Sequence, residues 1–267
     1  MDKTKKPIIT SEEEPTVPPK LIYRYNDMIR SLKERNLPIE EFYEYYQVQL
    51  NDTHPSIAVA ELMRLLVDDH HMDWDLAWDI TSKSIAYTNH TLLPEALEKW
   101  SLKLFESLLP RHLEIIYEIN SRFLQVVRMK YPGDDQVLRK LSIIDEAGNK
   151  SVRMAHLATV GSHHVNGVAT LHSELITKNL MPEFYDLWPH KFTNVTNGVT
   201  PRRWLADSNP ALSDVLNEYV GSDWVTDMSL LSNLENHIDD SALLEKIGAT
   251  KLIGKHKLAQ YIQETLG

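Results

Sequence analysis

The sequence predicts an α/β fold that is rich in helix, with parallel strands flanked by helices. Residues 48–50 are typical of a short strand, residues 51–55 of a polar loop, and residues 56–70 of a helix with one apolar face. Residues 192–196 are a second strand candidate that ends in a polar loop at Asn197. Strand, loop and helix in this order form an α/β layer, and ligands bind at the carboxyl ends of such strands.

The first 47 residues divide into two parts. Residues 1–20 contain four prolines and few large apolar groups, so we expect a flexible tail. Residues 21–37 carry apolar side chains at helical spacing, and Pro38 ends that helix. Residues 39–46 are a second, tyrosine-rich helix candidate.

The rest of the chain reads mainly as helix, with a hairpin in the middle. Asp73 is placed to cap a helix, and both Pro94 and Pro201 are placed to open one. Helices are expected at residues 74–86, 95–100, 108–130, 166–180, 209–219 and 230–267. Strands at residues 141–144 and 152–160 flank a turn. There is no internal repeat.

Composition excludes several classes of function. The net charge of −10 disfavours a basic face for nucleic acid, which must neutralise phosphates. The chain has no cysteine, which removes disulfides and thiol catalysis. It has neither an apolar signal core near its start nor a run of membrane-spanning length. We therefore expect a cytoplasmic protein with neither nucleic-acid nor membrane partners.

Polar residues that follow the strand candidates are the first candidates for a site. Asp52 and His54 suit a metal site by residue type, but Asp52 equally suits a helix cap and His54 a buried hydrogen bond. His90 suits a sugar hydroxyl, because neutral imidazole both donates and accepts, but it also suits a local turn. Asn197 offers a donor and an acceptor to adjacent hydroxyls, or merely forms a turn with Gly198.

The segment after Asn197 is the second candidate. Pro201 is followed by Arg202, Arg203 and Trp204, which we expect to begin a helix. Two guanidinium groups near free helix amides suit an anionic or hydroxyl-rich ligand. The alternative is a solvated face for the arginines and a core position for the tryptophan. There is no G-x-G-x-x-G motif and no P-loop.

Five motifs, in one order, closely resemble the α-1,4-glucan phosphorylases, the glycogen, starch and maltodextrin phosphorylases. The motifs are QLNDTHP (residues 49–55), YTNHTLLPEAL (87–97), LLPRHLEIIYEIN (108–120), GSHHVNGVATLHSEL (161–175) and VTNGVTPRRW (195–204). The resemblance covers residues 48–240, while residues 21–47 do not match the pattern. It implies a partial Rossmann-like domain of the GT-B type, with residues 241–267 as a helical extension toward a second domain.

The resemblance implies a glycosyltransferase of carbohydrate metabolism. Inorganic phosphate attacks the terminal glucose of an α-1,4-glucan and releases glucose 1-phosphate with retained configuration. The family's members are homodimers, many of them allosteric, and their cofactor is pyridoxal 5′-phosphate. Because the family's cofactor-anchoring lysine belongs to a C-terminal domain beyond the matched region, we expect these 267 residues to be a fragment that is inactive alone.

The resemblance also implies roles for single residues. It places glucose-binding or cleft-lining residues at His90, Asn197, Asp52, His54, Asn166, Gly167 and Val168. It implies that Arg203 and Trp204 contact the cofactor and, with less support, that Arg202 does so too. Tyr117, Asn120 and Glu146 match approximately a surface glucan site of some members, but we favour an ordinary amphipathic helix for this region. No residue is assigned a certain catalytic role, and no metal is expected.

Two other classes of function stay open. One is a noncatalytic glucan- or partner-binding module, in which residues 21–47 cover an exposed sheet edge. The other is a metal-dependent hydrolase built on Asp52, His54, His90 and His163.

Overall fold

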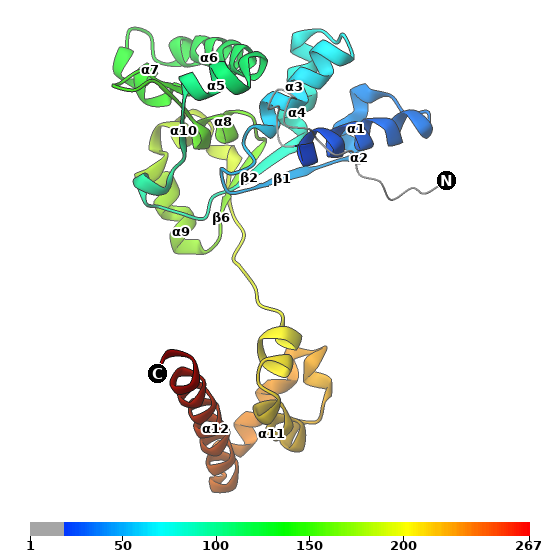
Figure 1. The fold of residues 1–267 in the computed structure, drawn as a ribbon, viewed down its shortest axis with the longest axis vertical. Coiled ribbons are helices and arrows are strands. Elements are labelled where there is room, and N and C mark those ends of the chain that lie inside the picture. The colour runs from blue at the N-terminus through cyan, green and yellow to red at the C-terminus, as the bar shows by residue number, and fades with distance from the viewer. Residues whose placement is uncertain (1–18) are drawn as a thin grey trace. The chain divides into compact units, whose positions relative to one another are not determined.

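The computed structural model describes residues 19–267, with side chains from residue 24 onward, as two compact units (Figure 1). Unit 1 is Met1–Thr196 and unit 2 is Asn197–Gly267. The division falls inside the range 48–240 that the sequence led us to expect as one piece. The expected tail lies almost entirely outside the described residues, and the first helix already begins at Pro19.

Unit 1 is built on a four-stranded parallel sheet in the order β1-β2-β6-β7. The strands are β1 (Val48–Asn51), β2 (Ile85–Thr88), β6 (His164–Gly167) and β7 (Phe192–Asn194). The expected strands at residues 48–50 and 192–196 are therefore confirmed in place. Leu50, Tyr87 and Val165 are fully buried, so the sheet centre belongs to the core.

Two of these strands were missed in the sequence. Ile85 and Ala86 were expected to end a helix, but they begin β2, and His164–Gly167 was expected to be partly loop and partly helix. Both strands are only four residues long. In such a short segment helical and strand periodicity cannot be told apart, so pairing decides the outcome: β2 pairs with β1, and β6 pairs with β2.

Helices flank this sheet. The first four are α1 (Pro19–Glu34), α2 (Phe42–Tyr45), α3 (Ala58–Arg64, continued as a π-helix to Asp69) and α4 (Trp74–Ser84). Figure 1 shows them gathered beside β1 and β2, and α1 packs on α3 through the buried side chains of Tyr25, Ile29 and Leu32. Asp73 caps α4 as expected, since its carboxylate accepts from the amide of Asp75 at 2.9 Å.

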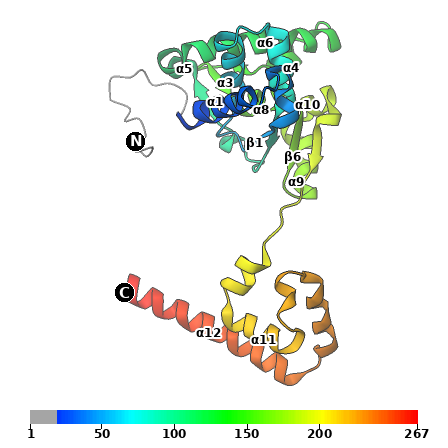
Figure 2. The ribbon, with the colours of Figure 1, turned by 90° about the vertical axis from the view of Figure 1, so that its right-hand side faces the viewer.

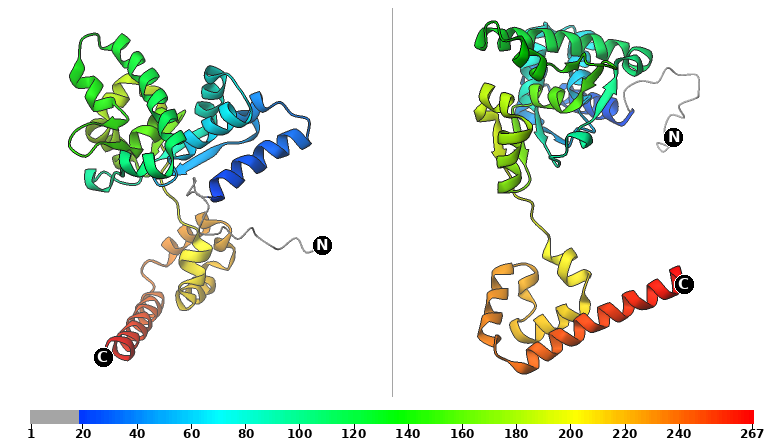
Figure 3. Two further views of the ribbon diagram at one scale, coloured as in Figure 1. Left: turned by 45° about the horizontal axis from the view of Figure 1, so that its top comes forward. Right: turned by 90° about the vertical axis from the view of Figure 1, so that its left-hand side faces the viewer.

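A second group of helices surrounds a small antiparallel sheet, ordered β3-β5-β4. The helices are α5 (Leu102–Leu108), α6 (Pro110–Lys130) and α7 (Asp135–Leu141), and Figure 3 shows them as one group, in green. The strands are β3 (Lys99–Ser101), β4 (Ile144–Asp145) and β5 (Ser151–Arg153). The expected long helix and the expected hairpin are thus present.

Two expectations in this region were wrong. Pro94 opens only one 3-10 turn, Pro94–Ala96, and Lys99–Ser101 pairs as a strand with β5. Met154–Val160, expected as strand, is helix α8. Met, Ala and Leu are good helix formers, and α8 is buried along nearly its whole length, so no polar face marks it as a helix in the sequence.

The remaining helices of unit 1 connect β6 to β7. They are α9 (Thr170–Leu175, continued as a π-helix to Leu180) and α10 (Pro182–Leu187). One continuous hydrophobic core runs from α1 to α10.

Unit 2 is helical. It contains a π-helix (Arg202–Asp207), α11 (Pro210–Val220), a 3-10 segment (Met228–His237) and α12 (Ser241–Leu266). Helices α11 and α12 lie side by side (Figure 2). Trp224 and Leu243 are buried within the unit. In neither unit is a described helix both long and apolar enough to cross a membrane.

Candidate functional site

Polar residues of three motifs meet at the carboxyl edge of the parallel sheet. Asn51, the last residue of β1, lies beside Thr88, the last of β2, and Thr88 lies beside Asn166 of β6. Side chains continue this row, because Gln49 Nε2 donates to Thr88 Oγ1 and Thr88 Oγ1 donates to Asn166 Oδ1, both at 2.8 Å. The four motif loops that follow β1, β2, β6 and β7 therefore start from one edge.

Asp52 takes the turn after β1 with a left-handed backbone, at φ 65°. This conformation is costly for most side chains, but Asp and Asn tolerate it. Its Oδ1 accepts from the amide of Thr53 at 2.7 Å, and its own amide donates to the carbonyl of Thr88 at 3.0 Å. Asp52 thus fixes the loop to β2 rather than capping helix α3, which begins at Ala58 without a side-chain cap.

His54 lies on the surface of the same loop, with 74% of its side chain exposed. Its Nδ1 is 3.3 Å from Glu98 Oε2, and the hydroxyl of buried Thr53 donates to the same carboxylate oxygen at 2.5 Å. Glu98 therefore holds the loop from a segment far along the chain. Glu98 was not predicted as a site residue, because the segment around it was expected to be a helix.

His90 stands at the end of the β2 loop and is exposed. Its Nε2 is 2.6 Å from Asn51 Oδ1, which orients the ring and leaves Nδ1 free of any protein partner in the described residues. Beneath it, Asn89 is fully buried: its amide donates to the carbonyl of Asn166 at 2.9 Å, and its Nδ2 donates to Tyr87 Oη at 3.1 Å. Burial raises the pKa of Tyr87, so this hydroxyl stays protonated.

Asn166, Gly167 and Val168 form the neighbouring wall. Asn166 Nδ2 donates to the carbonyl of Gly167 at 2.9 Å, which leaves the loop compact. A Cβ on Gly167 would lie 2.5 Å from Ser173 Oγ and 2.8 Å from Ser173 Cα, so only glycine fits where helix α9 approaches β6. Val168 is half-buried at the start of the loop to α9.

The other candidates belong to unit 2. Asn197 is exposed, and so are Arg203 and Trp204, with 65% of the tryptophan accessible. Pro201 precedes a π-helix that starts at Arg202, the residue at which we expected a helix to begin. Arg202 Nη1 donates to the carbonyl of Val225 at 3.3 Å, which anchors the start of that helix to its own unit.

The carboxyl edge of unit 1 is chemically suited to a neutral, hydroxylated ligand. The carboxylates of Asp52 and Glu98 bond within the β1 loop or to it. The other groups at the edge are amides, hydroxyls and imidazoles, which can donate and accept. The described residues contain no group of three or more His, Asp or Glu side chains arranged to hold a metal ion. His163, the fourth member of the alternative metal site, instead pairs through its ring nitrogens with His164 at 2.7 Å and Gln47 at 2.9 Å.

Comparison with known proteins decides the family. The family model described as carbohydrate phosphorylase matches residues 24–267. The chain belongs to this family. The match begins at residue 24, so it includes most of the segment 21–47, which we had not matched to the pattern from the sequence. Helix α1 and its packing on α3 therefore lie within the family's region.

Several curated phosphorylases are similar to the chain over most of its length. It is 58% identical over 236 residues to the glycogen phosphorylase of Synechocystis sp., covering 88% of this chain and 28% of that protein. It is 50% identical to glycogen phosphorylase 2 of Dictyostelium discoideum (89% and 24% covered). It is 51% identical to the muscle form of human glycogen phosphorylase (84% and 27% covered). The chain thus spans about a quarter of the length of these relatives.

Some residues of the edge were not found by sequence reasoning. Asn51, Thr88 and Asn89 hold the predicted residues in place. A signal was available for Asn51, which ends the predicted strand β1, but not for Thr88 and Asn89, because strand β2 was not predicted. Asn120, considered for a surface glucan site, is buried in α6, where its Oδ1 accepts from the amide of Ile143 at 2.8 Å. This hydrogen bond gives Asn120 a structural role, as expected if α6 is an ordinary amphipathic helix.

Proposed function

We propose that the whole protein is an α-glucan phosphorylase. It would transfer the terminal α-1,4-linked glucose of a glucan to inorganic phosphate and release glucose 1-phosphate with retained configuration. The proposal is supported by membership of the carbohydrate phosphorylase family and by relatives named glycogen phosphorylase. The observation that carries it for this chain is the row of neutral hydrogen-bonding groups along the carboxyl edge of the parallel sheet.

In this proposal the carboxyl edge holds the sugar and does not itself break the bond. His90, oriented by Asn51, presents its free ring nitrogen to a hydroxyl of the transferred glucose. Asn166, Gly167 and Val168 pack beside the sugar, while Asp52 and His54 line the glucan side of the cleft. For Asn197, which belongs to unit 2, the proposal of a glucose contact through its side-chain amide rests on the family resemblance alone.

The cofactor of the whole protein follows from the family alone. Arg203 and Trp204, with Arg202, would reach pyridoxal phosphate, but within unit 2 they are exposed and do not enclose a ring and a phosphate. These residues by themselves therefore do not fit a complete cofactor site. A homodimeric assembly is likewise a proposal from the family.

The alternative is a noncatalytic glucan-binding module. A first experiment tests the sugar site that both proposals require. Titration of the 267-residue chain with maltoheptaose in a calorimeter should give binding, which His90→Ala weakens about tenfold through loss of a hydrogen bond in a partly desolvated site. His256→Ala, an exposed histidine of α12, is the matched control and should bind normally. Equal binding by the His90 variant, or no binding by the folded chain, would contradict the assignment of the edge.

A parallel assay tests activity. With maltoheptaose, phosphate and pyridoxal phosphate present, the chain alone should release no glucose 1-phosphate, whereas a full-length phosphorylase should. Release by the pure chain would refute the expectation that the anchoring lysine lies outside these residues. Binding without release is the result expected of both a module and a fragment, and activity of the full-length protein distinguishes them.

A further inference from the structure

A cavity of unit 1 lies at the end of the parallel sheet opposite the carboxyl edge. It has a volume of about 460 Å³ and is formed by α4, α6 and the segments that lead into β6 and β7. Its lining residues Ser82, Val160 and Lys191 each stand shortly before a strand of the sheet. The cavity therefore faces the amino ends of the strands and is separate from the carboxyl edge that carries the family motifs.

Three tryptophans form the walls of this cavity. Trp74, Trp78 and Trp188 are half-buried, so each packs one side on the core and leaves the other open. Trp188 rests on Phe123, with ring centroids 5.4 Å apart, which fixes its plane. Among the described tryptophans, only Trp224 in unit 2 donates its indole N–H to a protein acceptor. The three cavity indoles thus keep their donors for a ligand.

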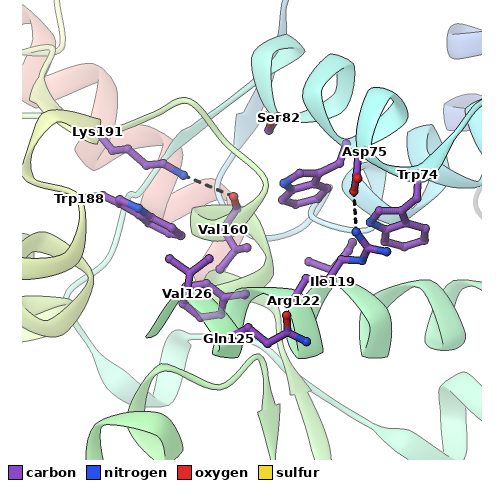
Figure 4. Close-up of a pocket in the computed structure, with 12 residues that line it drawn as sticks. Trp74, Asp75, Ser82, Ile119, Arg122, Gln125, Val126, Val160, Trp188 and Lys191 are labelled. Carbon is purple, nitrogen blue, oxygen red and sulfur yellow. Dashed lines mark hydrogen bonds and ion pairs between the residues drawn. The ribbon is translucent and has the colours of Figure 1, made fainter. Parts of the chain in front are cut away.

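The rim of the cavity carries polar groups (Figure 4). Arg122 is held by Asp75, with Nη1 2.6 Å from Oδ1, and its guanidinium lies 5.2 Å from the centroid of the Trp74 ring. Gln125, one turn further along α6, has no protein partner for its amide among residues 24–267. These planar groups offer both donors and acceptors beside the aromatic walls.

Lys191 closes the other side. Its Nζ lies 4.0 Å from the centroid of Trp188 and donates to the carbonyls of Thr159 at 3.3 Å and Val160 at 3.4 Å. No carboxylate pairs with it in the described residues. Burial lowers the pKa of Lys191 to about 8, so the ammonium is a strong donor whose charge is incompletely compensated.

Aromatic walls with a planar polar rim fit a saccharide. A glucose ring has apolar C–H faces, which pack on indole rings, and a rim of hydroxyls, which need paired donors and acceptors. We propose that the Trp74–Trp78–Trp188 cavity is a second glucan-binding site, which holds the polymer away from the reacting end. The choice of glucan as the ligand rests on the proposed function. The existence of a binding site rests on the aromatic walls and polar rim of the cavity.

The six tryptophans of the chain make the site directly observable. In ¹⁵N-labelled protein titrated with maltoheptaose, the indole signals of Trp74, Trp78 and Trp188 should shift together and saturate. Signals of Trp100, Trp204 and Trp224 should not follow them. Each signal is assigned by the loss of one resonance in a Trp→Phe variant.

Variants then separate this site from the carboxyl edge. Gln125→Ala, at an exposed position that does not threaten folding, should weaken the response of the three indoles roughly three- to tenfold, the range for one hydrogen bond. Gln260→Ala in α12 is the matched control and should change nothing. His90→Ala should leave the indole response intact, while the shifts in the backbone signals of residues 166–168 should require about tenfold more maltoheptaose.

Two results would overturn the proposal. One is an absence of shifts in the three indoles while residues 166–168 respond, which would leave the proposed function standing. The other is a shift with inorganic phosphate but not with neutral maltoheptaose, which would make the cavity an anion site on Lys191. If the indoles respond and residues 166–168 do not, the second site stands and the assignment of the carboxyl edge fails.

Discussion

The most demanding test of the fold concerns one buried carboxylate. Glu61 in α3 has no exposed surface, yet it is surrounded by cationic or polar partners. Its Oε2 accepts from His112 Nε2 at 2.7 Å and from Arg64 Nε at 3.0 Å, and its Oε1 accepts from Arg64 Nη2 at 3.1 Å. These bonds join α3 to α6 at the centre of unit 1.

The variant Glu61→Gln keeps the shape and removes the charge. The amide retains one acceptor, so at least one of the three donors then faces an N–H₂ group. Breaking a buried ion pair costs about 3–5 kcal/mol. Arg64 is 21% exposed and keeps Asp69 at 3.2 Å, which reduces the loss. We therefore expect destabilisation of about 2–4 kcal/mol at pH 7.

The same carboxylate makes this loss dependent on pH. Burial raises the pKa of Glu61, but the hydrogen bonds from His112 and Arg64 outweigh burial and hold the pKa below its ordinary value of 4.5. A lowered pKa in the folded state stabilises the protein above the unfolded pKa, and this contribution disappears as pH falls through the folded value. The difference between wild type and Glu61→Gln should therefore shrink below about pH 4.5.

Hydrogen exchange in peptides from α3 and α6 measures the opening of unit 1 alone, where about 1.4 kcal/mol corresponds to a tenfold change in protection. Glu114→Gln is the matched control: Glu114 pairs with Arg111 at 2.7 Å but is 66% exposed, so its loss should cost less than about 1 kcal/mol. Equal effects of the two variants, or a Glu61→Gln effect that persists unchanged at acid pH, would refute the reasoning.

Two further predictions concern close packing and a second carboxylate. Gly161→Ala should destabilise unit 1 by about 1–3 kcal/mol in denaturant unfolding, because its Cβ would lie 2.5 Å from Cγ1 of Val59, a stiff β-branched side chain. Asp145→Asn should cost about 1–2 kcal/mol at pH 7. Burial raises the pKa of Asp145, but Lys99, the Ala147 amide and Arg153 together lower it to about 2. The stabilisation is present above the ordinary value of 3.8 and is lost as pH falls from 3.8 to about 2.

Each of these has an internal control. Gly254→Ala in exposed α12, where nothing lies within 4 Å, should stabilise its helix by about 0.5–1 kcal/mol, the opposite sign from Gly161→Ala. For Asp145→Asn, the free energies of unfolding of wild type and variant should converge at pH 2. A gap that stays constant from pH 7 to pH 2 would contradict the role of the charge.

The sequence alone determined the family, the fold class and the order of the main elements. Long motifs such as VTNGVTPRRW specify many neighbouring side chains at once, so their joint occurrence in one order identifies the family. Long amphipathic helices such as α6 and α11, the cap at Asp73 and the strands β1 and β7 were also predictable. Their periodicity, their capping chemistry and their turn residues are local properties of the chain.

Tertiary structure decided the short elements and the contacts among the residues of the site. Strands β2 and β3 and helix α8 are short or wholly buried, so local periodicity does not define them and pairing or packing does. Glu98 reaches the loop of Thr53 and His54 from 45 residues away in sequence, and no local rule connects them. The pairing of His90 with Asn51 is likewise made by the parallel register of β1 and β2. Contacts between distant segments depend on which strands become neighbours, and only the folded chain fixes that.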